Sequence, residues 1–171
     1  MIGTLDTKGE EFAFLLEQLK AGGLQTVMID TGIMANPVWA ADIAAEEVAR
    51  RGGSDLATLR SNGNRAAAVA VMARGAQAIV GEMFDAGRIG GGICLGGGQG
   101  STIGAGALQV LPVGVPKIMV STIAGVDGAS ASIVGIRDMT LVNSVVDISG
   151  LNSLSRPIIA NAACAQDARC R

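Results

Sequence analysis

Glycines cluster near the middle of this 171-residue chain, where a short apolar segment meets a predicted helix. Residues 93–95 are followed by Gly96, Gly97, Gly98, Gln99, Gly100, Ser101 and Thr102. Backbone N–H groups that no side chain covers, together with the positive end of a helix dipole, bind anions. The pattern is not a P-loop, and Ile103 stands where the dinucleotide-binding pattern needs its third glycine. We therefore predict that this run binds a phosphate group.

A second polar segment follows the first predicted strand, where Thr4, Asp6, Thr7 and Lys8 precede an apolar helix. Thr7 and Glu10 have the spacing of a capping box, which predicts a helix start. A lysine in the first helical turn opposes the helix dipole unless it neutralises a bound anion. We therefore expect Lys8 to balance the charge of a phosphate, and Asp6 to hold a magnesium ion or a hydroxyl group.

Two further strand ends carry polar residues. Asp30, Thr31 and Gly32 end the second predicted strand, where an acid holds ribose hydroxyls in dinucleotide folds, although the same residues also form ordinary turns. Ser121 and Thr122 follow a later strand, and either ligand binding or helix capping explains them. Ligands of open parallel sheets bind beyond the carboxyl ends of the strands. These segments are therefore expected at the same edge.

Composition excludes several classes of function. The chain has no histidine, which excludes a Ser-His-Asp triad and imidazole acid–base catalysis. The spacing of Cys94, Cys164 and Cys170 fits neither a metal site nor a disulfide framework, and Cys94 is expected in the core. A net charge of −2 and 2% aromatic residues argue against nucleic-acid binding. With no bilayer-length apolar run and no signal peptide, we predict a cytoplasmic protein with no membrane partner.

Strand-like and helix-like segments alternate along most of the chain. This alternation predicts an α/β fold with an open, mainly parallel, Rossmann-like doubly wound sheet and helices on both faces. We expect strands at residues 1–4, 26–30, 89–95 and 115–120, and helices at residues 9–21, 42–52 (capped by Asp42), 64–86 and 101–110. Beyond residue 120 we expect a short strand at 133–136, a helix or strand at 139–146, and a helix at 155–165.

Several motifs together resemble one protein family. They are residues 3–10 (GTLDTKGE), 95–101 (LGGGQGS), 111–122 (LPVGVPKIMVST) and 144–152 (SVVDISGLN). These are similar to the ATP-binding domain family of the tomato mosaic virus resistance protein and its uncharacterised bacterial and fungal relatives. The resemblance implies an α/β domain over residues 1–163 that binds ATP with Mg²⁺, and a homodimer or higher oligomer. The first strand and a second domain are expected to be truncated, with residues 164–171 as an unstructured tail.

The resemblance also implies which residues contact the nucleotide. They are Thr4, Asp6, Thr7, Lys8, Gly96, Gly97, Gly98, Gln99, Gly100, Ser101, Thr102, Ser121 and Thr122. Residues 123–137 depart from the family pattern, and no catalytic residue is assigned. Two alternatives to a nucleotide-binding domain stay open. One is part of a transferase or hydrolase that acts on a small phosphorylated or acyl substrate and is completed by the second domain. The other is an interaction module that ATP stabilises.

Overall fold

The computed structural model describes residues 1–170, with side chains through residue 168, and is built on a parallel five-stranded sheet. The strand order is β2-β1-β3-β4-β5, and every neighbouring pair is parallel. The strands are β1 (Ile2–Gly3), β2 (Ile29–Asp30), β3 (Gly92–Gly96), β4 (Lys117–Ser121) and β5 (Thr140–Asn143). The predicted α/β class with an open parallel sheet is confirmed.

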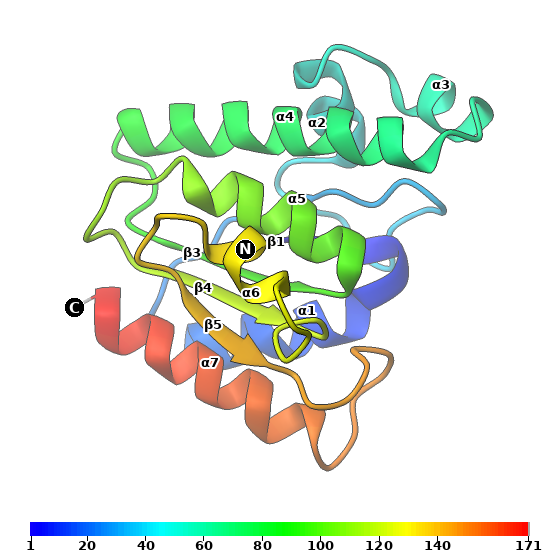
Figure 1. Ribbon diagram of the computed structural model, residues 1–171. Helices are drawn as coiled ribbons and strands as arrows, with labels where there is room; N and C mark the ends of the chain where they lie inside the picture. The colour runs from blue at the N-terminus through cyan, green and yellow to red at the C-terminus, as the bar shows by residue number, and fades with distance from the viewer. Residues whose placement is uncertain (171) are drawn as a thin grey trace.

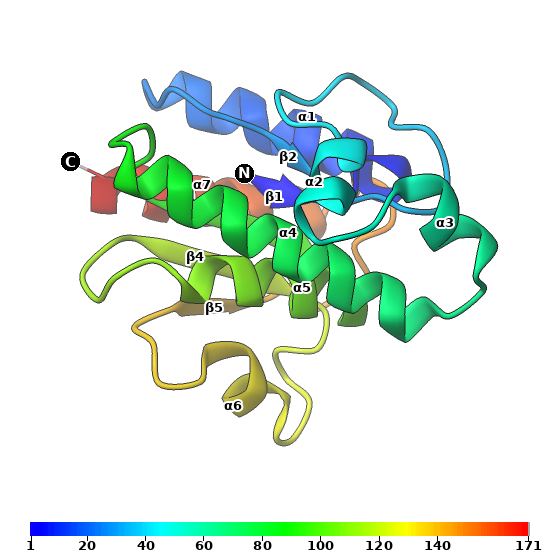
Figure 2. The ribbon, with the colours of Figure 1, turned by 90° about the horizontal axis from the view of Figure 1, so that it is seen from above.

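Helices cover both faces of the sheet (Figures 1 and 2). One face packs against α1 (Leu5–Ala21) and α7 (Ser155–Cys170). The other packs against α2 (Ala45–Arg51), α4 (Arg65–Asp85) and α5 (Gly98–Gln109), and the short helices are α3 (Leu56–Ser61) and α6 (Ala129–Val134). Because both faces are covered, consecutive residues of the central strands are all buried, as Ile118, Met119 and Val120 are.

Helix α4 is long and apolar enough to cross a membrane by length and composition alone. In the structure it packs against α2 and α5 (Figure 2). Its residues Met72, Ala76 and Ile79 are buried in the core. These contacts are those of a core helix in a folded domain.

Helix α5 lies unusually close to β3 at Gly104. A Cβ atom added there would stand 2.0 Å from Sγ of Cys94, so only glycine permits this approach. Cys94 is fully buried, and burial raises the pKa of its thiol to about 12. The expectation that Cys94 is a core residue is confirmed. Cys164 is exposed, and the side chain of Cys170 lies outside the described residues.

Helix α1 extends four residues further toward the N-terminus than the predicted helix at residues 9–21, and the predicted capping box is wrong. The helix begins at Leu5 with Thr4 in the N-cap position, so Thr7 lies inside its first turns and forms no capping box. Lys8 interrupts the helix with φ −134° and ψ 28°. The regular helical backbone is thus broken at Lys8, and the segment after the break begins at Gly9, where the sequence predicted the helix start.

Asp42 is not the cap of α2, which begins three residues later than predicted. Its carboxylate accepts a hydrogen bond of 2.7 Å from the N–H of Met28. Met28 lies just before β2, outside the strand pairing, and the short Asp side chain supplies an acceptor for its N–H group. Helix α3, which we did not predict, begins at Leu56 and is capped by Asp55, whose side chain accepts from Thr58 N–H at 2.8 Å.

The carboxyl-terminal third also differs from expectation. Residues 133–136 were expected to form a strand, but they lie at the end of α6 and in the turn after it. Of the helix or strand expected at residues 139–146, the strand is confirmed, because residues 140–143 form β5 and pair with the edge of β4. The tail predicted to be unstructured is helical through Cys170, because α7 packs against α1 and buries Ala163 and Gln166.

Candidate functional site

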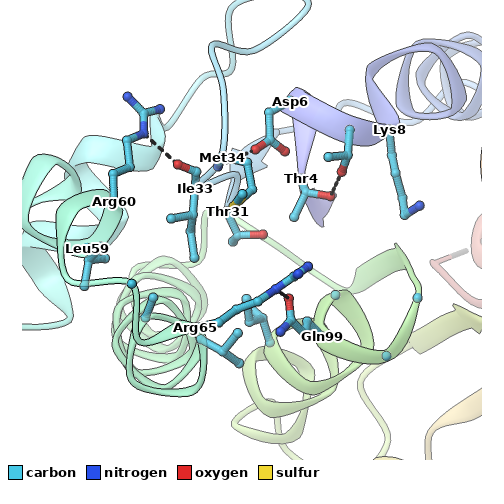
Figure 3. Close-up of a pocket in the computed structure, with 18 residues that line it drawn as sticks. Thr4, Asp6, Lys8, Thr31, Ile33, Met34, Leu59, Arg60, Arg65 and Gln99 are labelled. Atoms are coloured by element: carbon cyan, nitrogen blue, oxygen red, sulfur yellow. Dashed lines mark hydrogen bonds between the residues drawn. The ribbon is translucent and has the colours of Figure 1, made fainter.

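A cavity of about 580 Å³ opens at the carboxyl ends of β1, β2 and β3 (Figure 3). The chain leaves β1 toward β2 on one side and continues at β3 on the other, so the strand order reverses there. Ligands of open parallel sheets bind at such a reversal. The volume is that of an ordinary small-molecule site. The fold therefore places the cavity where the sequence argument expected a ligand.

Two of the predicted segments meet in this cavity. The cavity is lined by residues of the first strand end and of the glycine run, which are Thr4, Asp6, Thr7, Lys8, Gly97, Gly98, Gln99 and Gly100. They lie at the starts of α1 and α5, which begin at the same edge of the sheet because each follows one of the paired strands β1 and β3. Figure 3 shows the side chains of Thr4, Lys8 and Gln99 around the same space.

The α1 side of the cavity is held by short hydrogen bonds. The hydroxyls of Thr4 and Thr7 lie 2.8 Å apart. Asp6 Oδ2 accepts from the backbone N–H groups of Met34 at 2.8 Å and Ala35 at 3.2 Å, which ties the loop after β2 to α1. The other oxygen, Oδ1, is buried and has no hydrogen-bond partner. The ammonium group of Lys8 donates to the backbone carbonyl of Ile148.

The glycine run is not an irregular loop, because α5 begins at Gly98. A Cβ atom at Gly96 would lie 2.6 Å from the backbone of Gly100, so the tight turn requires glycine there. At Gly98 an added Cβ would meet nothing within 4 Å, and at Gly100 only Leu95 O at 3.8 Å. Close packing therefore explains why residue 96 is a glycine, but it does not explain why the residues that face the cavity are glycines.

The remaining predicted contacts do not line the cavity. They are Gly96, Ser101, Thr102, Ser121 and Thr122. The buried hydroxyls of Ser101 and Ser121 lie 2.6 Å apart and join α5 to the end of β4. The Thr102 hydroxyl donates to Gly98 O at 3.1 Å. Because β4 is one strand beyond the order reversal, its end lies beside the cavity wall.

Asp30, the acid at the end of β2, also lies outside the main cavity. Its Oδ1 accepts from the N–H groups of Leu5 at 3.0 Å and Gly32 at 2.8 Å. Burial raises the pKa of its carboxyl above the usual value. Asp30 faces a smaller cavity of about 160 Å³ that Glu46 and Arg60 also line. It is the next residue, Thr31, whose side chain lines the main cavity.

Sequence reasoning missed the basic residues on the opposite wall. Arg65 donates from Nε to Oε1 of Gln99 at 2.6 Å, which joins the starts of α4 and α5. Arg60 donates to the carbonyls of Ile33 at 2.6 Å and Ala35 at 3.0 Å. The signal for Arg65 was present, because a cation in the first turn of a helix opposes the dipole as Lys8 does.

Charge and hydrophobicity divide the cavity into two parts. Lys8, Arg60 and Arg65 line it, and Asp6 is the only carboxylate among its described lining residues. An apolar part is formed by Ile33, Met34, Leu59, Ala68, Val69 and Ile103. The described residues contain no group of three or more His, Cys, Asp or Glu side chains that could hold a metal ion. The arrangement fits a ligand with an anionic end and an apolar end.

Residues 1–168, which include every residue of this cavity, match the model of an uncharacterised protein family, the UPF0261 N-terminal domain. The chain belongs to the UPF0261 family. A UPF0261 protein of Clostridium tetani is 44% identical over 163 residues, which cover 95% of this chain and 40% of that protein. A relative in Mesorhizobium japonicum is 41% identical over 165 residues, with 95% of this chain and 40% of that protein covered.

A plant protein is a more distant relative of this UPF0261 domain. The ToMV resistance protein Tm-1(GCR237) of Solanum lycopersicum is 28% identical over 185 residues, which cover 96% of this chain and 24% of that protein. The resemblance inferred from the motifs is therefore confirmed at the level of the family. The chain spans about 40% of the length of the bacterial relatives that it matches.

Proposed function

We propose that this UPF0261 domain binds ATP in the cavity at the ends of β1, β2 and β3, with the phosphates at the start of α5. The observation that carries the proposal is the open space at Gly98 and Gly100. Neither glycine is required by packing, and both line a cavity with basic side chains. Side chains at these two positions would fill the space that a phosphate needs to reach the helix start.

The phosphate contacts follow from the geometry of α5. Its first intrahelical bond runs from Ser101 N–H to Gly97 O at 2.7 Å, so the N–H groups of residues 98–100 have no acceptor within the helix. Arg65 is held beside them through Gln99, and a guanidinium carries further donors besides Nε. Lys8 lies across the cavity. These groups supply hydrogen bonds and positive charge to an anionic ligand.

The apolar part of the cavity accounts for the other end of the ligand. Ile33, Leu59 and Val69 come from the loop after β2, from α3 and from α4. Side chains of this kind bury the faces of a flat heterocycle, and each square ångström of apolar surface removed from water contributes about 25 cal/mol. A nucleotide combines such a heterocycle with phosphates. Inorganic phosphate alone would leave this part of the cavity unused.

The residues of the cavity do not form a magnesium site by themselves. Mg²⁺ is usually held by one or two carboxylates together with substrate phosphates and water. Asp6 is the only carboxylate in the described lining, and two backbone N–H groups already occupy its Oδ2. A magnesium ion would therefore reach the site on the phosphates of ATP, where it neutralises their charge. The protein's own contribution is the basic and N–H donor set.

Isothermal titration calorimetry of the purified chain with ATP tests the proposal. We expect saturable binding below millimolar ATP, and a loss of about tenfold or more in affinity for Arg65→Ala, since a charge-assisted hydrogen bond is worth roughly 1.5–3 kcal/mol. The matched control is Arg50→Ala, which removes an exposed arginine paired with Glu47 on α2, outside the cavity. Folded protein without saturable binding up to millimolar ATP would refute the proposal.

A further inference from the structure

Two buried polar atoms in the cavity wall have no hydrogen-bond partner among the residues that the structure describes: the hydroxyl oxygen of Thr31 and Oδ1 of Asp6. Both residues line the cavity, and Thr31 is only 1% exposed. Buried polar groups are nearly always paired, because leaving one unpaired costs free energy on folding. A wall that keeps two such atoms beside a cavity is arranged for a ligand that pairs with them.

The backbone brings the two atoms to the same part of the cavity. Thr31 follows β2 and Asp6 lies in the first turn of α1, which are neighbours because β1 and β2 pair. A Cβ atom at Gly32 would lie 2.8 Å from Asp6 Oδ1, so the glycine lets the carboxylate approach the chain beside Thr31. Figure 3 shows the Asp6 carboxylate and the Thr31 hydroxyl on the cavity wall, between Ile33 on one side and Lys8 on the other.

The chemistry of the two atoms selects their partner. A carboxylate oxygen only accepts hydrogen bonds, whereas a threonine hydroxyl both donates and accepts. Phosphate oxygens are repelled by Asp6, and the faces of a heterocycle offer no donor. Neighbouring hydroxyl groups satisfy both atoms, since one donates to the carboxylate and the other exchanges a hydrogen bond with threonine.

We infer that Asp6 and Thr31 bind the ribose hydroxyls of the nucleotide. The inference rests on the proposed function and adds to it the part of the ligand that determines specificity. The position agrees with it, because ribose lies between the base and the phosphates, as these two atoms lie between the apolar and basic parts of the cavity. The sequence indicated Asp30 for this role, but the backbone N–H groups of Leu5 and Gly32 occupy its Oδ1.

Affinities of ATP, 2′-deoxy-ATP and 3′-deoxy-ATP, measured by calorimetry with wild-type protein, test the inference. We expect at least one deoxy analogue to bind about tenfold more weakly than ATP, as the loss of a hydrogen bond to a charged group predicts. Thr31→Val is expected to weaken ATP binding several-fold and to reduce the difference between ATP and that analogue. Inorganic tripolyphosphate, which has no hydroxyl groups of this kind, is expected to bind wild type and Thr31→Val equally.

Thr31→Val keeps the branched shape of the side chain, so the apo protein is expected to be as stable as wild type or more stable, in urea unfolding. The control is Thr140→Val, the same change on β5 away from the cavity, which should leave nucleotide affinities unchanged. Equal affinity of wild type for ATP and both deoxy analogues would overturn the ribose assignment while the proposed function stands. Discrimination that appears only after Mg²⁺ is removed would also overturn it, because Asp6 would then hold the metal whenever Mg²⁺ is present. Absence of any ATP binding would instead refute the proposed function itself.

Discussion

Alanine substitutions in the glycine run separate glycines kept for packing from glycines kept for a ligand. At Gly98 an added methyl group meets no atom within 4 Å, and at Gly100 the nearest is Leu95 O at 3.8 Å. Neither residue is among those with positive φ. Alanine in a helix is favoured over glycine by about 0.5–1 kcal/mol. We therefore expect Gly98→Ala and Gly100→Ala to increase the free energy of unfolding by up to about that amount.

The comparison variant is Gly104→Ala in the same helix. Its added methyl group would lie 2.0 Å from Cys94 Sγ and 2.9 Å from Cys94 Cβ, inside the contact between α5 and β3. Overpacking of a buried contact costs about 1–3 kcal/mol. The helix propensity gained by alanine offsets only part of that cost. Gly104→Ala is therefore expected to destabilise the protein, and a second substitution, Cys94→Ala, should restore part of the loss.

The assay pairs urea unfolding with ATP titration for each variant. Gly98→Ala and Gly100→Ala should unfold at the same or higher urea concentration than wild type but bind ATP at least several-fold more weakly, because the methyl group stands where a phosphate would approach the helix. Gly104→Ala should unfold at lower urea concentration and bind ATP normally under conditions where it stays folded. If Gly98→Ala and Gly100→Ala were stable and bound ATP as wild type does, the argument that open space marks a phosphate site would be wrong.

Three further outcomes follow from charges in the structure. The Lys117 ammonium lies 2.9 Å from Asp138 and holds the pKa of that carboxyl at about 2, below its usual 3.8. The stability that this pair contributes should therefore be present above about pH 4 and be lost as the pH falls through about 2. In urea unfolding between pH 2 and 5, the Asp138→Asn variant should not show this pH-dependent loss of stability. Burial, and to a lesser extent the charge of Asp6, raise the pKa of Asp30, so Asp6→Asn should lower the Asp30 pKa in an NMR titration. The folded state disfavours the ionised form of Asp30. Lowering the pH through the raised pKa of Asp30 should therefore increase the stability of the protein, which is opposite in sign to the effect of Asp138. Finally, chelation of Mg²⁺ with EDTA should weaken ATP binding without abolishing it, and complete loss in calorimetry would show that the protein itself holds the ion.

Local patterns were enough to predict most of the elements. The helices expected at residues 9–21, 64–86 and 155–165 correspond to α1, α4 and α7, and the strands expected at 89–95 and 115–120 correspond to β3 and β4. The patterns failed where a distant partner decides the outcome. The sequence left residues 139–146 open between helix and strand, and pairing with β4 decides for a strand. Asp42 accepts a hydrogen bond from the N–H of Met28 instead of capping α2. Such partners lie far away in sequence, and propensity does not encode them.

The candidate site was likewise predicted only in part from the sequence. The residue types after β1 and β3 identified two segments that line the cavity, since glycine, threonine and lysine at strand ends are unusual on packing grounds alone. The sequence did not indicate which strand ends adjoin. The order β2-β1-β3-β4-β5 brings the ends of β1, β2 and β3 together and leaves Ser121 and Thr122 beside the cavity.

By itself, the sequence determined the class of fold, the polar strand ends and the glycine-rich helix start, because these depend on residue type and short-range spacing. Tertiary structure alone decided that Arg65 meets Gln99, that Asp30 is occupied by backbone N–H groups, and that Thr31 and Asp6 keep unpaired oxygens beside one cavity. The physical reason is strand pairing. Hydrogen bonds between strands distant in sequence fix which side chains become neighbours, and only neighbours can form a site.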